Sequence, residues 1–170
     1  MSMAIVNGVA AIGLAWVGTK APLFGKLIAR GEGKELKRLF MKSLQQSYFV
    51  VILTSILCFG AIQLVSEIFP KFENRLLPLI PLSSLFLYVI LNHLVNCQAV
   101  FLRAFKEEPF LLPTVVGSFC IGICDFVFGI KYGGTGIAIA YLLVTIFLLP
   151  LPVSIWWKKW RSLTEEGKPN

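Results

Sequence analysis

The hydrophobic and polar positions divide the chain into long apolar runs that are separated by short charged segments. A transmembrane helix needs about 20 mainly apolar residues, and five runs approach that length. We therefore predict five transmembrane helices, over about residues 3–24, 47–67, 78–102, 110–130 and 136–157. The predicted fold class is all-α, a polytopic membrane helix bundle within residues 1–161, followed by a cytoplasmic tail over residues 162–170.

A long polar interruption, residues 18–43, holds seven of the sixteen Lys and Arg residues. We expect the first helix to continue to Arg30 and to end at residues 31–33 (Gly-Glu-Gly), because glycine there favours a helix C-terminus. A second helix is expected from about Lys34. Its apolar positions at 36, 39, 40 and 44 are typical of a cytoplasmic amphipathic helix at the membrane surface, which leads into the second span.

The last two spans are separated by residues 131–136 (KYGGTG), which predict a tight turn because glycine accepts backbone angles that other residues avoid. Pro150 and Pro152 are expected to bend the final turns of the fifth span, since each proline removes a helical hydrogen bond. Three tryptophans among cationic residues then form a pattern typical of the aromatic belt at a membrane interface: Trp156, Trp157 and Trp160.

The distribution of positive charge predicts the orientation of the spans. If residues 18–43 are cytoplasmic, the inside segments carry thirteen of the sixteen cationic residues, and the outside segments 68–77 and 131–135 carry three. Short cytoplasmic loops are enriched in Lys and Arg. We therefore predict a multi-pass protein with its N-terminus outside and its C-terminus in the cytoplasm.

The composition supports lipid as the solvent of this chain. Hydrophobic residues make up 56% of it and charged residues 15%, which is more apolar than an average soluble domain. The net charge of +7 could indicate a nucleic-acid partner. However, the cationic residues lie at the ends of apolar segments rather than on one soluble face. We therefore predict an integral membrane protein that contacts membrane lipid and no nucleic acid.

The sequence contains no recognisable catalytic, metal-binding or cofactor-binding motif. It has one histidine, no nucleophile elbow, no HExxH and no phosphate-binding loop. The four cysteines, at positions 58, 97, 120 and 124, fall inside apolar runs without the partner spacing of a metal site, so we interpret them as packing residues. We predict no enzymatic activity, no cofactor and no metal.

Three segments carry a resemblance to a known family. Residues 22–40 contain the end of a span followed by LIARGEGKELKRLF, residues 102–110 read LRAFKEEPF between two spans, and residues 132–138 read YGGTGIA at the start of the last helix. Their order and spacing resemble the polysaccharide (O-antigen-type) flippases, often labelled polysaccharide biosynthesis proteins, of the multidrug/oligosaccharidyl-lipid/polysaccharide exporter superfamily.

The resemblance implies the last five helices of the second of two bundles that enclose a central cavity in a bacterial inner (plasma) membrane. It also implies translocation of a lipid-linked oligosaccharide or polysaccharide precursor by alternating access. The implied partners are that substrate, membrane lipid, and a missing N-terminal bundle or a second copy. The alternative functions are a cation-coupled multidrug exporter of the same superfamily, and a non-transporting remnant or partner-dependent subunit.

The third span carries polar residues at intervals of four, which places them on one helix face: Ser84, Tyr88, Asn92 and Asn96, with His93 beside them. Polar side chains at membrane depth face protein or a water-filled cavity. One interpretation is a substrate cavity that binds sugar hydroxyls or diphosphate. The other is hydrogen bonding between helices. His93 is either a hydrogen-bonded structural residue or a proton-sensing group.

Charged residues supply two further candidate sites. Asp125 is the one acidic residue well inside a predicted span, and such residues are often functional. It either binds a coupling cation or proton, or it reaches water or pairs with Lys131. Three cationic residues either contact the lipid-linked diphosphate or contact anionic headgroups and orient the protein: Arg30, Lys37 and Arg38.

Overall fold

The computed structural model describes residues 2–68 and 77–165, and within these ranges the chain forms helices and no strands. The helices are α1 (Ser2–Gly18), α2 (Ala21–Ala29), α3 (Gly33–Ile68), α5 (Leu79–Arg103), α6 (Leu111–Leu148) and α7 (Pro150–Glu165). Four helical stretches are long and apolar enough to cross a membrane: Ser2–Ala29, Gly33–Ile68, Leu79–Arg103 and Leu111–Leu163. The predicted all-α class is confirmed. Most of the predicted outer segment 68–77 and of the tail 162–170 lies outside the described residues.

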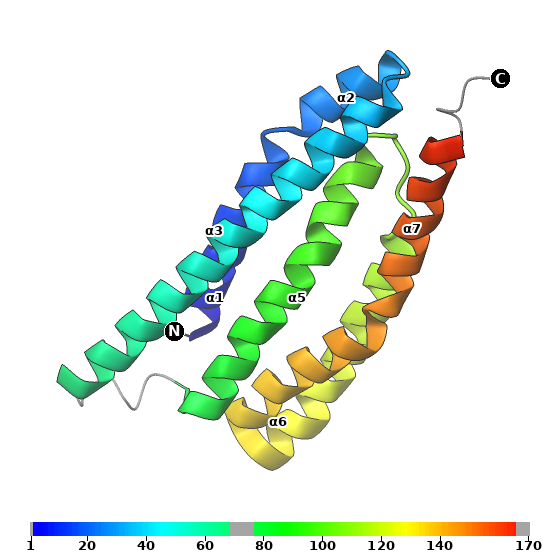
Figure 1. The fold of residues 1–170 in the computed structure, drawn as a ribbon. Coiled ribbons are helices and arrows are strands. Elements are labelled where there is room, and N and C mark those ends of the chain that lie inside the picture. Colours follow the sequence, from blue (N-terminus) through cyan, green and yellow to red (C-terminus); the bar gives the residue numbers. More distant parts are fainter. Residues whose placement is uncertain (1, 69–76, 166–170) are drawn as a thin grey trace.

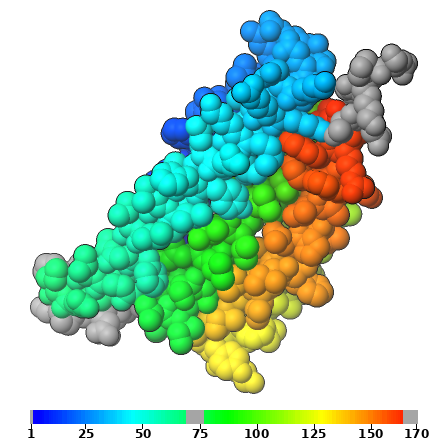
Figure 2. Space-filling view, viewed as in Figure 1, coloured from blue at the N-terminus to red at the C-terminus, as the bar shows by residue number. Residues whose placement is uncertain are grey.

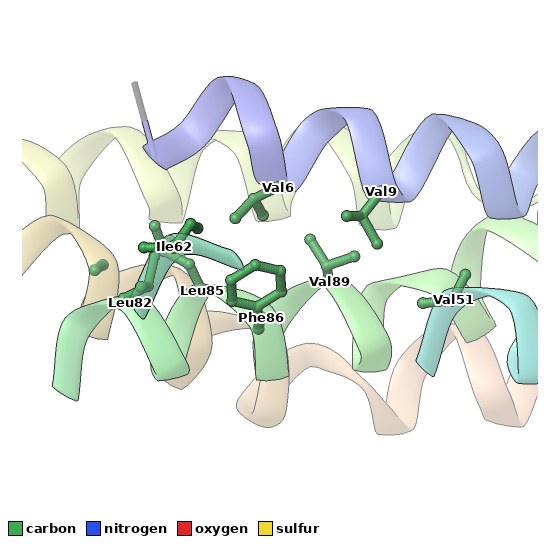
Figure 3. Packing of buried hydrophobic residues seen from close by; sticks show 9 residues of the cluster. Val6, Val9, Val51, Ile62, Leu82, Leu85, Phe86 and Val89 are labelled. Atoms are coloured by element: carbon green, nitrogen blue, oxygen red, sulfur yellow. The ribbon is translucent and has the colours of Figure 1, made fainter. Parts of the chain in front are cut away.

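The helices form an elongated bundle with α5 at its centre, between α1 and α3 on one side and α6 and α7 on the other (Figure 1). One apolar cluster joins α1, α3 and α5 near one end; Figure 3 shows Val6 and Val9 of α1 facing Val89 and Phe86 of α5. A second cluster joins α2, α3, α5 and α7 near the other end. α5 contributes to both clusters, and Ala138 of α6 completes the first.

The first predicted helix is interrupted at residues 19 and 20, which corrects the expectation of a continuous helix to Arg30. The cause is Pro22 near the start of α2, since proline lacks the N–H that would continue the helical ladder and its ring collides with the preceding turn. The predicted end of α2 is confirmed. Gly31 has a φ of 71°, and the N–H groups of Gly31 and Glu32 donate to the carbonyl oxygens of Ile28 and Leu27, as in a Schellman motif.

α3 is a single helix of 36 residues, about 54 Å long. Residues 34–44, which we expected as an amphipathic surface helix leading into the second span, are its first turns and continue into that span without a break. The reason is that one buried face runs along the helix through Leu36, Phe40, Ser47 and Val51. The amphipathic pattern therefore arises from packing against neighbouring helices.

α6 folds back on itself at Gly133, whose backbone angles (φ 60°, ψ −145°) are not helical. Its two limbs, residues 111–132 and 134–148, run antiparallel, as the hairpin in Figure 1 shows. Gly129 of the first limb lies against Ile137 of the second, and a side chain at Gly136 would collide with the carbonyl oxygen of Phe128. The predicted turn at residues 131–136 is therefore present, and glycine is needed there for space as well as for backbone angle.

α7 begins at Pro150, directly after Leu149, which keeps helical backbone angles. Trp156 and Trp160 are half-buried in the second cluster, where both rings pack within 6.0 Å of the Phe40 ring. Trp157 is exposed, and the Arg161 guanidinium lies over its ring. Of the three tryptophans predicted at a membrane interface, two thus serve helix packing, because α3 and α5 bring aromatic partners that the local pattern cannot reveal.

Candidate functional site

A cavity of about 270 Å³ lies between α5 and the α6 hairpin, and three residues of the predicted polar stripe line it. We call it the stripe cavity. Its α5 wall is formed by Tyr88, Asn92 and Asn96. Ser84 does not line the cavity, and its hydroxyl donates a hydrogen bond to the carbonyl oxygen of Ile80 in the same helix. The opposite wall adds three hydroxyl groups from the two limbs of α6: Thr114, Ser118 and Thr145.

The polar side chains of the stripe cavity are available to a ligand. Among the described residues, none of the six donates or accepts a side-chain hydrogen bond within the protein. Thr114 and Ser118 are exposed at the open side, and Tyr88, Asn92 and Asn96 are half-buried. Asparagine amides both donate and accept hydrogen bonds, as hydroxyl groups do. The wall can therefore bind a ligand rich in hydroxyl groups.

A second cavity of about 260 Å³ continues from the first toward the segment that joins α5 to α6. We call it the joint cavity. It shares Asn96 and Thr114 with the stripe cavity, and at its far end it is lined by Arg103, Glu107 and Glu108. The two cavities are adjacent and share part of their lining, and we call them together the groove. Its lining is uncharged along α5 and charged at the end of that helix.

The charges at the joint differ in how firmly they are paired. The Lys159 ammonium lies 2.6 Å from a Glu107 carboxylate oxygen and 4.7 Å from the centre of the Phe105 ring. The Arg103 guanidinium lies 3.7 Å from a Glu108 oxygen, and both side chains are mostly exposed. Exposed ion pairs with this separation add little to stability. Glu107 is thus held by α7, whereas Arg103 is free to exchange its partner.

His93 lies about 100° around α5 from Asn92, outside the lining of the stripe cavity and against α1 and α3. Only 1% of its surface is exposed, and its Nε2 atom lies 2.6 Å from Ser47 Oγ. The Gly13 carbonyl oxygen can only accept, so Ser47 donates its one hydrogen there (2.7 Å) and accepts from His93 Nε2–H. His93 therefore links α1, α3 and α5 through Ser47, which supports the structural interpretation.

Asp125 does not form the predicted pair with Lys131, whose ammonium lies over the ring of Tyr132 at 5.3 Å. One carboxylate oxygen of Asp125 is buried, and among the described residues it has no hydrogen-bond partner. The residue lies one turn beyond Ile121 of the stripe cavity, toward the Gly133 turn. It is outside the cavity lining and carries no evident ligand set.

The three predicted headgroup contacts do not converge on one site. Arg30 makes an exposed ion pair with Glu32 at 3.9 Å. The Lys37 ammonium lies over the ring of Trp160 at 4.8 Å, and Arg38 is exposed. Neighbouring residues on a helix point about 100° apart, which separates Lys37 from Arg38. None of the three cationic residues lines either cavity.

Sequence reasoning missed the partners of the stripe on α6 and the charged end of the groove. Thr114 and Ser118 are four residues apart, so an equivalent polar face was visible in the sequence. Arg103 lies seven residues after Asn96, a spacing that places the two residues on the same face of the helix. No group of three or more potential metal ligands occurs among the described residues.

Comparisons with protein-family models, with curated proteins and with solved structures found no match to this chain. What the site can do is therefore inferred from its geometry.

Proposed function

We propose that this chain acts in a membrane flippase that translocates a lipid-linked oligosaccharide, with the sugar bound in the stripe cavity. The observation that carries the proposal is a wall of amide and hydroxyl groups without protein partners, placed between helices that are apolar elsewhere. Polar groups at membrane depth are costly unless they meet other polar groups or water. A sugar with many hydroxyl groups satisfies them, and no covalent bond changes during transport.

The outer surface supports membrane residence. Five large side chains of α6 are between 71% and 83% exposed: Leu112, Phe119, Phe126, Ile130 and Phe147. Exposed apolar area of this kind is unfavourable in water and suits lipid tails. The two limbs of the last apolar stretch are each counted as a span in this proposal, which makes five spans in total.

The ends of the bundle support the predicted orientation. The α2–α3 connection, the α5–α6 joint and the C-terminal part of α7 gather at one end, and the Gly133 turn lies at the other (Figure 1). Gly33 lies near Leu163, and Lys159 pairs with Glu107, which ties these segments together. Most cationic residues belong to this end, so it faces the cytoplasm by the positive-inside rule.

A cation-coupled exporter of the same superfamily is the second candidate function. The buried, unpartnered oxygen of Asp125 favours it, because such a group is a natural acceptor for a proton or a metal cation. One carboxylate oxygen without further ligands is a weaker site than the six-residue wall. The open side of the stripe cavity favours a second bundle as a partner in either function.

The function is tested by complementation of a bacterial strain that lacks its polysaccharide flippase, with surface glycan as the readout. We expect glycan to be restored by the chain, and to be lost in the Asn92→Leu/Asn96→Leu variant. Ser83→Leu is the matched control, because Ser83 lies on the same helix, is exposed and bonds only within its own turn. A wild-type chain that inserts in the membrane and restores no glycan would contradict transport by this chain alone.

The orientation is tested by labelling single cysteines in a variant whose four native cysteines are replaced by alanine. Tyr132→Cys lies at the hairpin turn and Lys106→Cys at the joint, and both positions are exposed. A membrane-impermeant maleimide is expected to reach position 132 from outside and position 106 only after the membrane is opened. Labelling of both from the same side would refute the five-span topology.

A further inference from the structure

We propose that Arg103 holds the phosphate of a lipid-linked substrate at the charged end of the groove while Asn92 and Asn96 hold its sugar. This inference rests on the proposed function and adds the binding mode of the substrate. Its structural basis is that the stripe cavity and the joint cavity meet at Asn96 and Thr114. One ligand can therefore occupy both.

The spacing along α5 fits such a ligand. Asn92, Asn96 and Arg103 are separated by four and seven residues, which keeps all three on one face of the helix. The rise per residue places Arg103 about 10 Å beyond Asn96 along the axis. That distance is on the scale of one sugar ring plus a diphosphate group. The lipid tail then leaves the groove at its open side, where α6 is apolar.

The electrostatics of the joint single out Arg103 among the groups that line the groove. Glu107 is already neutralised by Lys159 at 2.6 Å, so it neither repels an anion strongly nor competes for Arg103. Glu108 is the only acidic group paired with Arg103 among the described residues, and that pair is long and exposed. A phosphate that displaces Glu108 exchanges a weak surface ion pair for a bidentate contact.

The chemistry of the side chain suits the role. The guanidinium group presents parallel N–H donors that match two phosphate oxygens, and it remains charged at any physiological pH. Arg103 Nε lies 3.7 Å from a Glu108 carboxylate oxygen, so an anionic group already lies beside the guanidinium. Both cavities lack the three cationic residues predicted to contact the diphosphate, Arg30, Lys37 and Arg38. We therefore assign the diphosphate contact to Arg103, at the end of α5.

The test measures binding of three probes to the purified full chain in nanodiscs of phosphatidylcholine, a zwitterionic lipid. The probes are undecaprenyl diphosphate, a lipid phosphate without sugar; dodecyl maltoside, a neutral sugar lipid; and inorganic pyrophosphate, a phosphate without lipid. The variants are Arg103→Gln, Glu108→Gln and Asn92→Leu/Asn96→Leu. Lys106→Gln is the matched control, because Lys106 lies in the same joint, is exposed and lines neither cavity.

We expect Arg103→Gln to weaken undecaprenyl diphosphate binding about tenfold or more and to leave maltoside binding within about twofold. The double asparagine variant is expected to do the reverse. Glu108→Gln is expected to tighten binding of the lipid phosphate about threefold, because it removes the competing carboxylate. Lys106→Gln is expected to change either affinity by less than about twofold, because its exposed charge lies outside both cavities and is screened by salt.

Three results would overturn the assignment of Arg103. If Glu108→Gln weakens lipid phosphate binding as Arg103→Gln does, the Arg103–Glu108 ion pair only maintains the structure of the joint. If Lys106→Gln weakens binding as much as Arg103→Gln does, the phosphate is attracted by the overall positive charge of the joint and not by Arg103 in particular. If inorganic pyrophosphate binds as tightly as the lipid phosphate, the ligand is a free phosphate. Failure of both lipid probes to bind saturably would refute the proposed function itself, whereas saturable binding with no effect of Arg103→Gln refutes only this inference.

Discussion

Both sides of α5 carry polar groups, but their surroundings differ. On the side toward α1 and α3, His93 is fully buried and hydrogen-bonded to Ser47, within a close-packed surface that includes Phe86 and Val89. On the face toward α6, Asn92 and Asn96 are half-buried beside a cavity and have no hydrogen-bond partners among the described residues. The helices therefore close tightly on one side of α5 and leave space on the other.

The difference shows how one helix can serve both stability and binding. Buried polar groups in a native structure are normally satisfied by the protein. On the packed face, Ser47 hydrogen-bonds to both Gly13 and His93, whereas His93 Nδ1 has no partner among the described residues. On the cavity face, the half-buried amides of Asn92 and Asn96 make no hydrogen bond among the described residues. A ligand or water can complete their hydrogen bonds. Figure 2 shows the elements in question side by side on one surface, with α5 (green) between α3 (cyan) and the chain of α6 and α7 (orange).

The largest effect on stability is expected from Gly13→Val, which adds a side chain where α1 packs against α3 and α5. A Cβ atom at Gly13 would collide with a methyl group of Val51 and lie 3.0 Å from the His93 ring. We expect a loss of about 3 kcal/mol in the free energy of unfolding, because the stiff neighbours cannot yield. Reversible unfolding in mixed detergent–SDS micelles measures it.

Gly8→Ala is the control for this substitution, since it lies in the same helix with no heavy atom within 4 Å of the added methyl group. We expect a change within about 1 kcal/mol, from helix propensity alone. Equal losses at positions 8 and 13 would show that α1 is not held by close contact at Gly13.

A smaller effect is expected from Ser47→Ala, which removes the link between Gly13 and His93. The His93 Nε2–H and the Gly13 carbonyl oxygen would each lose a partner inside the bundle. We expect a loss of about 1–2 kcal/mol in the free energy of unfolding. Ser55→Ala is the matched control on the same helix, because the buried Ser55 hydroxyl has no hydrogen-bond partner among the described residues. It is expected to be neutral or stabilising, and a loss equal to that of Ser47→Ala would contradict the network.

The smallest effect on stability is expected on the cavity face, from Asn92→Leu. Its amide makes no protein hydrogen bond among the described residues, and leucine adds apolar contact beside the cavity. We expect Asn92→Leu to raise the free energy of unfolding by less than about 1 kcal/mol, because polar residues kept for binding are often not optimal for stability. A loss above that value would assign Asn92 to helix packing and would remove the contrast between the two faces.

The positions of the helices could be predicted from the sequence, because they depend on local properties. Apolar length marked α5 within one residue of its observed ends, and glycine marked the end of α2 and the reversal at Gly133. Pro22 was also visible in the sequence, and it causes the break before α2. The sequence alone did not show that a new helix begins at this proline, so a single continuous helix was predicted.

The polar stripe could be recognised because helix periodicity places residues 88, 92 and 96 on one face, but its surroundings could not. Only the tertiary structure decided that His93 turns toward α1 and α3, that Trp156 and Trp160 join the core, and that Arg103 ends the same groove. The physical reason is that periodicity defines faces within a helix, whereas the rotation and distance between helices depend on the packing of the whole bundle. A polar residue is a binding group or a structural one according to which neighbour that packing provides.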